Sequence, residues 1–209
     1  MKRILIVDDH YIFRQGLKKI IADAFEPLMF GEAENSEAAS RLMHNSPWDL
    51  VILDINLPGR SGLDFLKDVH SYKPELPVLV LSMYEEDQMA LRAIKAGAMG
   101  YITKAKAAEN LIGAIERILD GNKYITETVA ELLVGEYKKE KTINVVKDLS
   151  DREYFILLRL AAGESVTEIS RTLALSVKTI STYRSRIFKK LGLKSNIQLM
   201  QFAKDNNLG

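Results

Sequence analysis

The chain has 209 residues, of which 47% are hydrophobic, and this length and composition are typical of a soluble globular protein with one large or two ordinary domains. Its formal net charge is +1, and it contains no cysteine, which excludes disulfides and thiolate metal sites. No apolar run approaches the roughly 20 residues that span a bilayer, and acids stand too near the start for a signal peptide, so we expect a cytoplasmic protein without membrane segments.

Strand-like and helix-like patterns alternate through the first part of the chain. Short Val/Ile/Leu-rich runs are typical of buried parallel strands, and each is followed by the apolar spacing of an amphipathic helix. The predicted strands are 3–7, 28–34, 50–54, 77–82 and 100–103. The predicted helices are 11–24, 37–45, 63–71, 85–96 and 107–119. Because parallel neighbours need crossover helices, we predict an α/β fold, a doubly wound five-stranded parallel sheet.

The sheet pattern ends at Gly121-Asn122, and residues 122–148 are the predicted linker. Within it, 125–139 is expected to be a short helix capped by Thr126, and 140–148 is expected to be loose, so that the tether permits domain motion. Beyond it we predict an all-α domain of four short helices. Three begin with a capping-box pattern and the fourth with a plain N-cap: Ser150/Glu153, Ser165/Glu168, Ser195/Gln198 and Ser176.

Charge divides the chain as the element pattern does. Residues 1–121 hold 14 Lys/Arg and 18 Asp/Glu, whereas residues 149–209 hold 10 and 5. Between Arg171 and Lys194 there are seven bases and no acid. An acidic first part with a basic last part indicates a nucleic-acid-binding appendage. The alternative for the basic run taken alone is a solvated helical face.

Three aspartates stand where predicted strands stop: Asp8 and Asp9 after the first strand, and Asp54 after the third. In open α/β sheets the ligand crevice lies beyond the carboxyl ends of the strands, so these carboxylates are expected to converge. Several negative charges a few ångströms apart are unfavourable unless a divalent cation binds, and hard oxygen ligands indicate Mg²⁺. Taken singly, each aspartate is as readily a helix cap or a loop residue.

Two more polar residues end strands at the same edge. Lys104 follows the fifth strand, and Ser82 ends the fourth. Metal, ammonium and hydroxyl are the groups that a phosphoryl group needs as charge spreads over its oxygens. One carboxylate would then be the nucleophile that forms an acyl phosphate. The three histidines, His10, His44 and His70, show no metal-ligand spacing and receive no role.

The segment 166–192 contains two predicted helices separated by LALS, the length of a helix-turn-helix connection. In the second helix the inward face is apolar, and the outer face is short, polar and basic. Small hydroxyl side chains let a backbone approach base edges, and flanking bases neutralise phosphates. The inward residues are Ile180, Tyr183, Ile187 and Leu191. The outer residues are Lys178, Ser181, Thr182, Ser185 and Lys189, with Arg184, Arg186 and Lys190 beside them.

Together these residues resemble the NarL/FixJ family of two-component response regulators over nearly the whole chain. The pair DD after the first strand, D after the third, S after the fourth and K after the fifth resemble the CheY-like, flavodoxin-like receiver. LSDRE at 149–153 and TISTYRSRIFKKLGLKS at 179–195 resemble the LuxR-type helix-turn-helix. The implied domains are a receiver at 1–121, a linker at 122–148 and a DNA-binding domain at 149–209.

The resemblance to the receiver implies a role for each residue of the acidic site. Asp54 would accept the phosphoryl group, Asp9 would bind Mg²⁺ directly, and Asp8 would assist. The carbonyl of Asn56 would be a further metal ligand. The residues implied to hold the phosphoryl group and to switch are Lys104, Ser82 and Tyr101. Where the family commonly has proline after its lysine, this chain has Ala105.

The resemblance to the LuxR-type domain implies which side chains face DNA. Bases would be contacted by Ser181, Thr182 and Ser185. Phosphates would be held by Lys178, Thr179, Tyr183, Lys189 and Lys194. The last helix would supply the dimer contact, at Ile197, Met200 and Ala203.

The implied function is a transcription regulator that a sensor histidine kinase phosphorylates on Asp54 with Mg²⁺, rather than a multiple-turnover enzyme. Activation would produce a homodimer that binds promoter DNA at two half-sites related by two-fold symmetry. Two other classes stay open from the residues alone. One is a phosphatase with an aspartyl nucleophile, although such enzymes usually carry DxD where this chain has DDH. The other is an interaction protein that uses the receiver fold only to dimerise.

Overall fold

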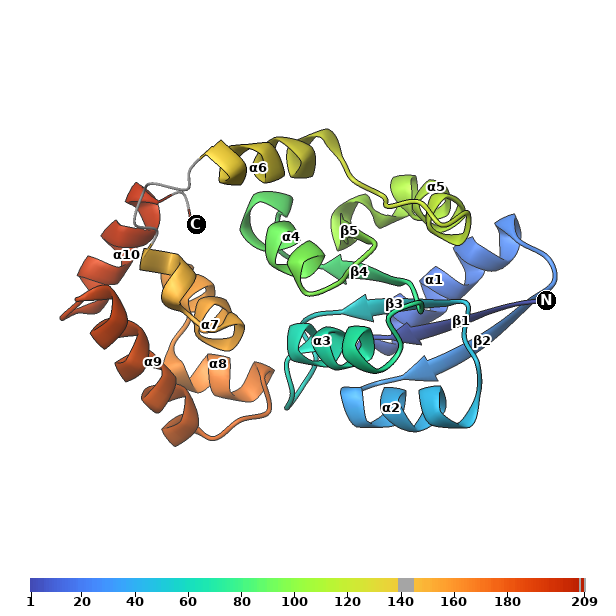
Figure 1. Cartoon of the computed structure of the whole chain (residues 1–209). Helices are drawn as coiled ribbons and strands as arrows, with labels where there is room; N and C mark the ends of the chain where they lie inside the picture. Colours follow the sequence, from blue (N-terminus) through green and yellow to red (C-terminus); the bar gives the residue numbers. More distant parts are fainter. Residues whose placement is uncertain (139–144, 207, 209) are drawn as a thin grey trace. The chain divides into compact units, whose positions relative to one another are not determined.

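The computed structural model (Figure 1) describes residues 1–138, 145–206 and 208. The chain forms two compact units, Met1–Lys138 and Lys139–Gly209. The first is a five-stranded parallel sheet with flanking helices, and the second is helical. The predicted fold class is confirmed.

The sheet of the first unit has the strand order β2-β1-β3-β4-β5 and is parallel throughout. The strands are β1 Lys2–Val7, β2 Leu28–Ala33, β3 Leu50–Asp54, β4 Val78–Ser82 and β5 Gly100–Thr103. The order changes direction beside β1, since β2 lies on one side of it and β3 on the other. Val7 pairs with Leu53, so the residues that follow β1 and β3 leave the sheet at one edge. This is the edge at which doubly wound sheets bind ligands.

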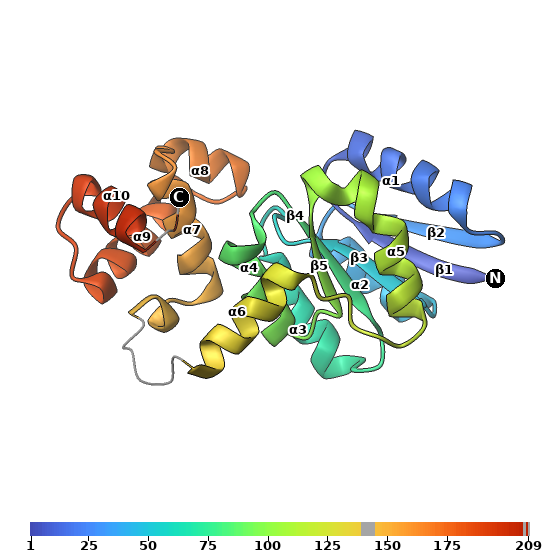
Figure 2. The same ribbon diagram turned by 90° about the horizontal axis from the view of Figure 1, so that it is seen from above.

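Helices cover both faces of this sheet (Figures 1 and 2). Helices α1 (Tyr11–Ala24) and α5 (Ala107–Leu119) lie on one face, and α2 (Ser36–Asn45), α3 (Gly62–Tyr72) and α4 (Glu86–Lys95) lie on the other. Successive side chains of a strand point to opposite faces of the sheet, and helices cover both faces, so β3 and β4 are buried along their whole length. This burial on both faces explains why the strands are continuous apolar runs in the sequence.

After α5 the chain follows the outer edge of β5. The Tyr124 N–H donates to the Met99 carbonyl at 2.8 Å, and Tyr124 forms a parallel bridge with Gly100. Helix α6 (Glu127–Lys138) then packs against α4, with Val129 only 1% exposed. The helix expected near 125–139 is therefore present, and it is docked on the first unit. Of the stretch expected to be loose, residues 140–144 lie outside the described residues, and Val145–Asp148 forms the short 3₁₀ helix η2.

The second unit contains helices α7 (Asp151–Ala161), α8 (Val166–Thr172), α9 (Val177–Leu191) and α10 (Asn196–Asp205). The capping boxes of α7 and α8 are both formed, because each serine and its glutamate exchange bonds with main-chain N–H groups. At α10 the Ser195 hydroxyl accepts from the Gln198 N–H, but the Gln198 side chain bonds the N–H of Lys194 instead of Ser195. Within the described ranges, no helix has both the length and the apolar character to cross a membrane.

Candidate functional site

The acidic pocket lies at the edge of the sheet where β1 and β3 end. Asp8 and Asp54 are each 1% exposed, whereas Asp9 is exposed. Ligand atoms from Asp8, Asp9, His10 and Asp54 all lie within 4.8 Å of one another. The structure thus brings the three predicted acids together and adds His10, whose Nδ1 is 2.9 Å from Asp9 Oδ1 and 3.1 Å from Asp8 Oδ1.

Lys104 closes the pocket from the end of β5. Its Nζ lies 2.6 Å from Asp8 Oδ2 and 2.6 Å from Asp54 Oδ2, so one ammonium faces two buried carboxylates. The same Nζ is 4.6 Å from the centre of the Phe13 ring, an aromatic contact that the sequence analysis missed. With Asp9 included, the acids outnumber this lysine three to one.

Main-chain groups fix the other oxygens of the two buried aspartates. The Asn56 N–H donates to Asp54 Oδ1 at 2.8 Å, and the His10 N–H donates to Asp8 Oδ1 at 2.8 Å. The Arg14 side chain donates to the Asp8 carbonyl at 2.6 Å. The carboxylates are therefore oriented by their own loops. Their excess negative charge and their oxygen donors fit a hard divalent cation.

The electrostatics of the pocket are in conflict at Asp54. Burial raises the pKa of Asp54 to about 6, since Lys104 lowers it by less than burial and the nearby Asp8 raise it. Burial alone lowers the pKa of Lys104, but Asp54 and Asp8 outweigh burial, so the pKa of Lys104 is raised. The lysine therefore stays charged, and Asp54 is an unusually basic carboxylate.

Ser82 and Tyr101 both contact the β4–α4 loop. Ser82 is fully buried, and its Oγ accepts from the Tyr84 N–H at 3.1 Å. The Tyr101 ring is 1% exposed, and its hydroxyl donates to the Tyr84 carbonyl at 2.7 Å. Burial raises the pKa of Tyr101, so its hydroxyl keeps the proton that it donates. The main-chain N–H of Tyr84 is thus bonded to Ser82 of β4, and its main-chain carbonyl to Tyr101 of β5.

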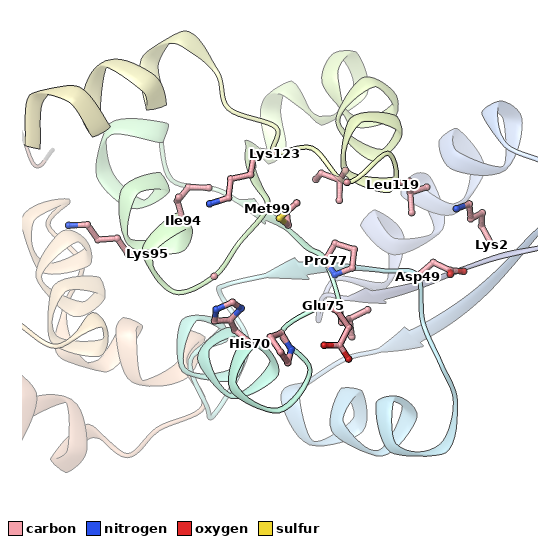
Figure 3. Close-up of a pocket in the computed structure, with 15 residues that line it drawn as sticks. Lys2, Asp49, His70, Glu75, Pro77, Ile94, Lys95, Met99, Leu119 and Lys123 are labelled. Atoms are coloured by element: carbon pink, nitrogen blue, oxygen red, sulfur yellow. The ribbon is translucent and has the colours of Figure 1, made fainter. Parts of the chain in front are cut away.

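A separate hollow of about 580 Å³ lies at the opposite edge of the sheet, where the strands begin (Figure 3). Its rim includes Lys2, His70, Lys95 and Lys123. Lys2 and Lys95 lie at its two ends, so its charged groups do not converge on one point (Figure 3). We assign it no ligand.

In the second unit, α9 exposes the hydroxyl side chains that were predicted to face bases. Ser181, Thr182 and Ser185 are exposed, while Ile180 and Ile187 are fully buried on the other side of the helix. The hydroxyls of Thr182 and Ser185 donate to helix carbonyls at 2.9 and 3.0 Å. Their oxygens keep free lone pairs, so each can still accept from a base amino group.

The residues predicted to hold phosphates divide into two groups. Lys178, Lys189 and Lys194 are exposed, whereas Thr179 and Tyr183 are half-buried. The Thr179 Oγ1 also lies 2.7 Å from the Ser176 Oγ, at the start of the helix. The three exposed lysines, two on α9 and one just after it, therefore remain the strongest candidates for phosphate contacts.

Two flanking bases are used within the unit rather than displayed for a ligand. Lys190 Nζ donates to Glu153 Oε2 at 2.6 Å and to the Asp148 carbonyl at 2.9 Å. Arg184 donates to Asn196 Oδ1 at 2.9 Å and lies over the Phe188 ring. Both bases therefore bond a neighbouring helix of their own unit, in addition to lying beside the polar face of α9.

The last helix shows only part of the predicted dimer stripe. Ile197 is 80% exposed and Met200 is 49% exposed, but Ala203 is 3% exposed. Ala203 faces the interior of its own unit, since one turn of α10 places it with the buried Leu199 rather than with Met200. The prediction of Ala203 as a surface contact is corrected accordingly.

Comparison with known protein families identifies both parts of the chain. Residues 4–116 match the family described as "Response regulator receiver domain". Residues 147–203 match the family described as "Bacterial regulatory proteins, luxR family". The two matches together cover most of the chain.

Individual proteins are similar over nearly the full length. The chain is 34% identical to "Response regulator GacA" of Pseudomonas aeruginosa over 97% of this chain and 95% of that protein. It is 31% identical to "Response regulator UvrY" of Escherichia coli K12 over 97% and 94%. Among solved structures, RcsB of Salmonella enterica serovar Typhimurium bound to the promoter rprA with the phosphomimetic BeF₃⁻ is 26% identical, with a TM-score of 0.65 and coverage of 98% and 99%.

Proposed function

Since the chain belongs to the two-component response regulators that join a receiver domain to a LuxR-type DNA-binding domain, we propose that phosphorylation of Asp54 switches its binding to promoter DNA. The chain is a DNA-binding transcription regulator, and its family is not one of multiple-turnover enzymes. We propose the domain limits 1–121, 122–148 and 149–209. The single observation that carries the switch is the placement of Asp54 and Lys104 in one buried, acid-rich pocket.

Asp54 is the proposed acceptor because of its surroundings. Its Oδ1 is held by the Asn56 N–H and its Oδ2 lies against Lys104, so both oxygens are oriented before a phosphoryl donor arrives. A pKa of about 6 leaves the carboxylate ionised at neutral pH and more basic than an ordinary aspartate. The carboxylate oxygen would bond to phosphorus while the bond from phosphorus to the donor nitrogen of a kinase phosphohistidine breaks.

The proposed metal is Mg²⁺, held by Asp9, Asp8, Asp54 and the carbonyl of Asn56. Its acid-rich oxygen ligands and its position beside the acceptor support this assignment. Bound there, Mg²⁺ would neutralise charge on the transferring phosphoryl oxygens. Lys104 would meet the same oxygens from the β5 side.

The phosphoryl group would act through Ser82, Tyr101 and Lys104. It replaces the single negative charge of the carboxylate with about two negative charges and three strong acceptor oxygens. Lys104 would leave Asp8 for these oxygens, and the Ser82 hydroxyl would turn from Tyr84 to donate to them. Tyr101 would then lose its fixed partner at Tyr84, and the surface formed by α4 and α5 would change.

DNA would meet the exposed side of α9. We propose base contacts from Ser181, Thr182 and Ser185, and phosphate contacts from Lys178, Thr179, Tyr183, Lys189 and Lys194. The structure described as "two RcsB dimers bound to two parallel DNAs" has a TM-score of 0.60 to this chain and 28% identity. By analogy we propose a homodimer that uses Ile197 and Met200 and binds two-fold related half-sites about one helical turn, or a multiple of it, apart. The other partner is a sensor histidine kinase, and the compartment is the cytoplasm, where the promoter DNA lies.

Labelling tests the acceptor directly. With acetyl phosphate and Mg²⁺, the full chain should gain one phosphoryl group by intact mass, and Asp54→Asn should gain none, because the amide is not a nucleophile. Asp23→Asn removes an exposed acid outside the pocket and should label as the wild type does. Persistent labelling of Asp54→Asn at the wild-type level would eliminate Asp54 as the acceptor.

A further inference from the structure

A buried carboxylate outside the acidic pocket ties helix α6 to the first unit. Glu86, the first residue of α4, is 5% exposed. Its Oε2 accepts a hydrogen bond from the Thr126 hydroxyl, and its Oε1 lies 3.6 Å from Lys106 Nζ. We call Glu86, Thr126 and Lys106 the Glu86 clamp. A buried carboxylate is destabilised when it loses its hydrogen-bond donor, and here that donor is the Thr126 hydroxyl.

Thr126 performs two tasks at the start of α6. Its hydroxyl proton goes to Glu86, and the same oxygen accepts from the Val129 N–H at 3.3 Å. One hydroxyl has a single proton and two lone pairs, so both bonds form together. The residue that caps α6 is therefore also the residue that fixes the helix to α4.

The remaining described contact of α6 with α4 is apolar. Val129 is 1% exposed, and Leu132 and Leu133 are half-buried, which is the spacing of one helical face. Val134, on another side, is 55% exposed. A helix of 12 residues is marginal by itself, so its order depends on this apolar face and on the Glu86 clamp.

Both sides of the Glu86 clamp continue from groups of the acidic pocket. Glu86 follows Ser82 by four residues, and Lys106 follows Lys104 by two. Between Ser82 and Glu86 lies Tyr84, which is held by Ser82 and Tyr101. If the Ser82 hydroxyl turned toward a phosphoryl group, the loop before Glu86 would lose its bond to Ser82, and Lys104, two residues before Lys106, would take a new partner. Both changes would act next to residues of the Glu86 clamp.

We propose that the Glu86 clamp holds α6 on α4 in the unphosphorylated protein and opens when Asp54 is phosphorylated. The proposal rests on the proposed function, since Asp54 phosphorylation is its trigger. Tyr124 stays bonded to the Met99 carbonyl, so in the open form the edge of β5 still holds Tyr124 while α4 no longer holds α6. The Glu86 clamp therefore controls whether the last described helix of the first unit is held in place.

Hydrogen exchange of the full chain tests the proposal, with intact mass reporting phosphorylation by acetyl phosphate and Mg²⁺. Amides of α6 should exchange about tenfold faster in the phosphorylated wild type, the factor for one lost charge-assisted hydrogen bond. Glu86→Gln and Thr126→Val should show the same increase without phosphorylation. Slow exchange of β1 and β3 amides in both variants shows that the sheet is intact. The matched controls, Glu85→Gln and Thr128→Val, alter exposed neighbours and should leave α6 protected.

Two results would overturn the clamp while leaving the proposed function standing. One is unchanged α6 exchange in protein whose mass shows the phosphoryl group, and the other is unchanged exchange in both clamp variants. A mass without the phosphoryl group would contradict the proposed function itself, and the clamp would lose its trigger with it.

Discussion

Two buried carboxylates, one in each unit, meet a lysine at the same distance and respond in opposite ways. Asp54 in the receiver and Glu153 in the helical unit each lie 2.6 Å from a lysine Nζ. The pKa of Asp54 is raised to about 6. Burial also raises the pKa of Glu153, but hydrogen bonds from Lys190 and Ser150 outweigh burial, and the pKa is lowered.

The surroundings of the two acids explain the difference. Asp54 shares Lys104 with Asp8, so one ammonium group compensates two carboxylate charges. Lys190 bonds one carboxylate, that of Glu153, and the neutral carbonyl of Asp148, and Glu153 also completes a capping box with Ser150. A carboxylate that is the one acid bonded to its lysine is structural, whereas one that shares its lysine with a second buried acid is available for a metal or a phosphoryl group.

The largest expected effect comes from removing Glu153, the carboxylate whose pKa is lowered by its hydrogen bonds. Glu153→Ala removes the capping-box acceptor and the partner of Lys190, and should lower the free energy of unfolding of the helical unit by about 3 kcal/mol. Amide exchange of α9 measures it. Glu168→Ala removes the corresponding capping box from α8. Glu168 is exposed and its capping box includes no lysine, so this change should lower the free energy of unfolding by less. Equal losses would show that Lys190 contributes nothing.

Removing the charge of Asp54, unlike removing that of Glu153, should increase stability. Asp54→Asn removes a buried charge while Lys104 keeps Asp8, so it should raise the stability of the receiver at pH 7 by about 2 kcal/mol without metal. Trp48, the one tryptophan of the chain, lies in the receiver and reports its unfolding in urea by fluorescence. A loss of stability would mean that the Lys104 pair outweighs the burial of Asp54.

The same difference predicts opposite responses to pH. The raised pKa means that folded Asp54 binds its proton more tightly than the unfolded chain does, so its cost is present above about 6 and absent below the ordinary value of 3.8. Wild-type receiver stability should therefore rise by about 1 kcal/mol relative to Asp54→Asn between pH 7 and pH 5. Glu153 has a lowered pKa, so its contribution is present above 4.5 and is lost as the pH falls through its folded pKa. A parallel response of wild type and Asp54→Asn would contradict the assignment.

Two lysines of α9, Lys190 and Lys178, should differ in the same way, one affecting stability and the other DNA binding. Lys190→Met should destabilise the helical unit and leave the salt dependence of DNA binding unchanged, because its ammonium is bonded to Glu153 and Asp148. Lys178→Met should keep the stability and reduce the slope of log affinity against log salt by about 0.9, the value for one phosphate contact. Anisotropy titrations at several salt concentrations measure both slopes. The reverse result would move Lys190 to the DNA interface.

Sequence predicted the sheet and the acidic pocket because both depend on local pattern. Apolar runs mark buried parallel strands, and residues that follow such strands must leave at one edge, which brings Asp8, Asp54 and Lys104 together. The pattern contained no sign of the pairing of Lys190 with Glu153, 37 residues away, or of Glu86 with Thr126, 40 residues away. These bonds depend on how helices pack, which periodicity does not specify.

His10 and Ala203 show the two other ways in which sequence fell short. His10 was judged by the spacing of histidines, and its signal was its position directly after two acids. Ala203 was placed on a surface stripe by spacing from Ile197, but a six-residue step overshoots the exposed side of a helix, and the residue is buried. Small side chains give weak evidence about which side faces water.

The central claim, that charge on Asp54 controls DNA binding by α9, is tested most directly by one titration. Fluorescent DNA selected from a random pool by the phosphorylated chain is titrated with wild type and Asp54→Asn, each with and without acetyl phosphate and Mg²⁺. The account predicts that wild-type affinity changes about tenfold or more on phosphorylation, within the usual range of allosteric coupling, and that Asp54→Asn does not respond. An unchanged wild-type affinity at full phosphorylation, or an equal response from Asp54→Asn, would contradict it.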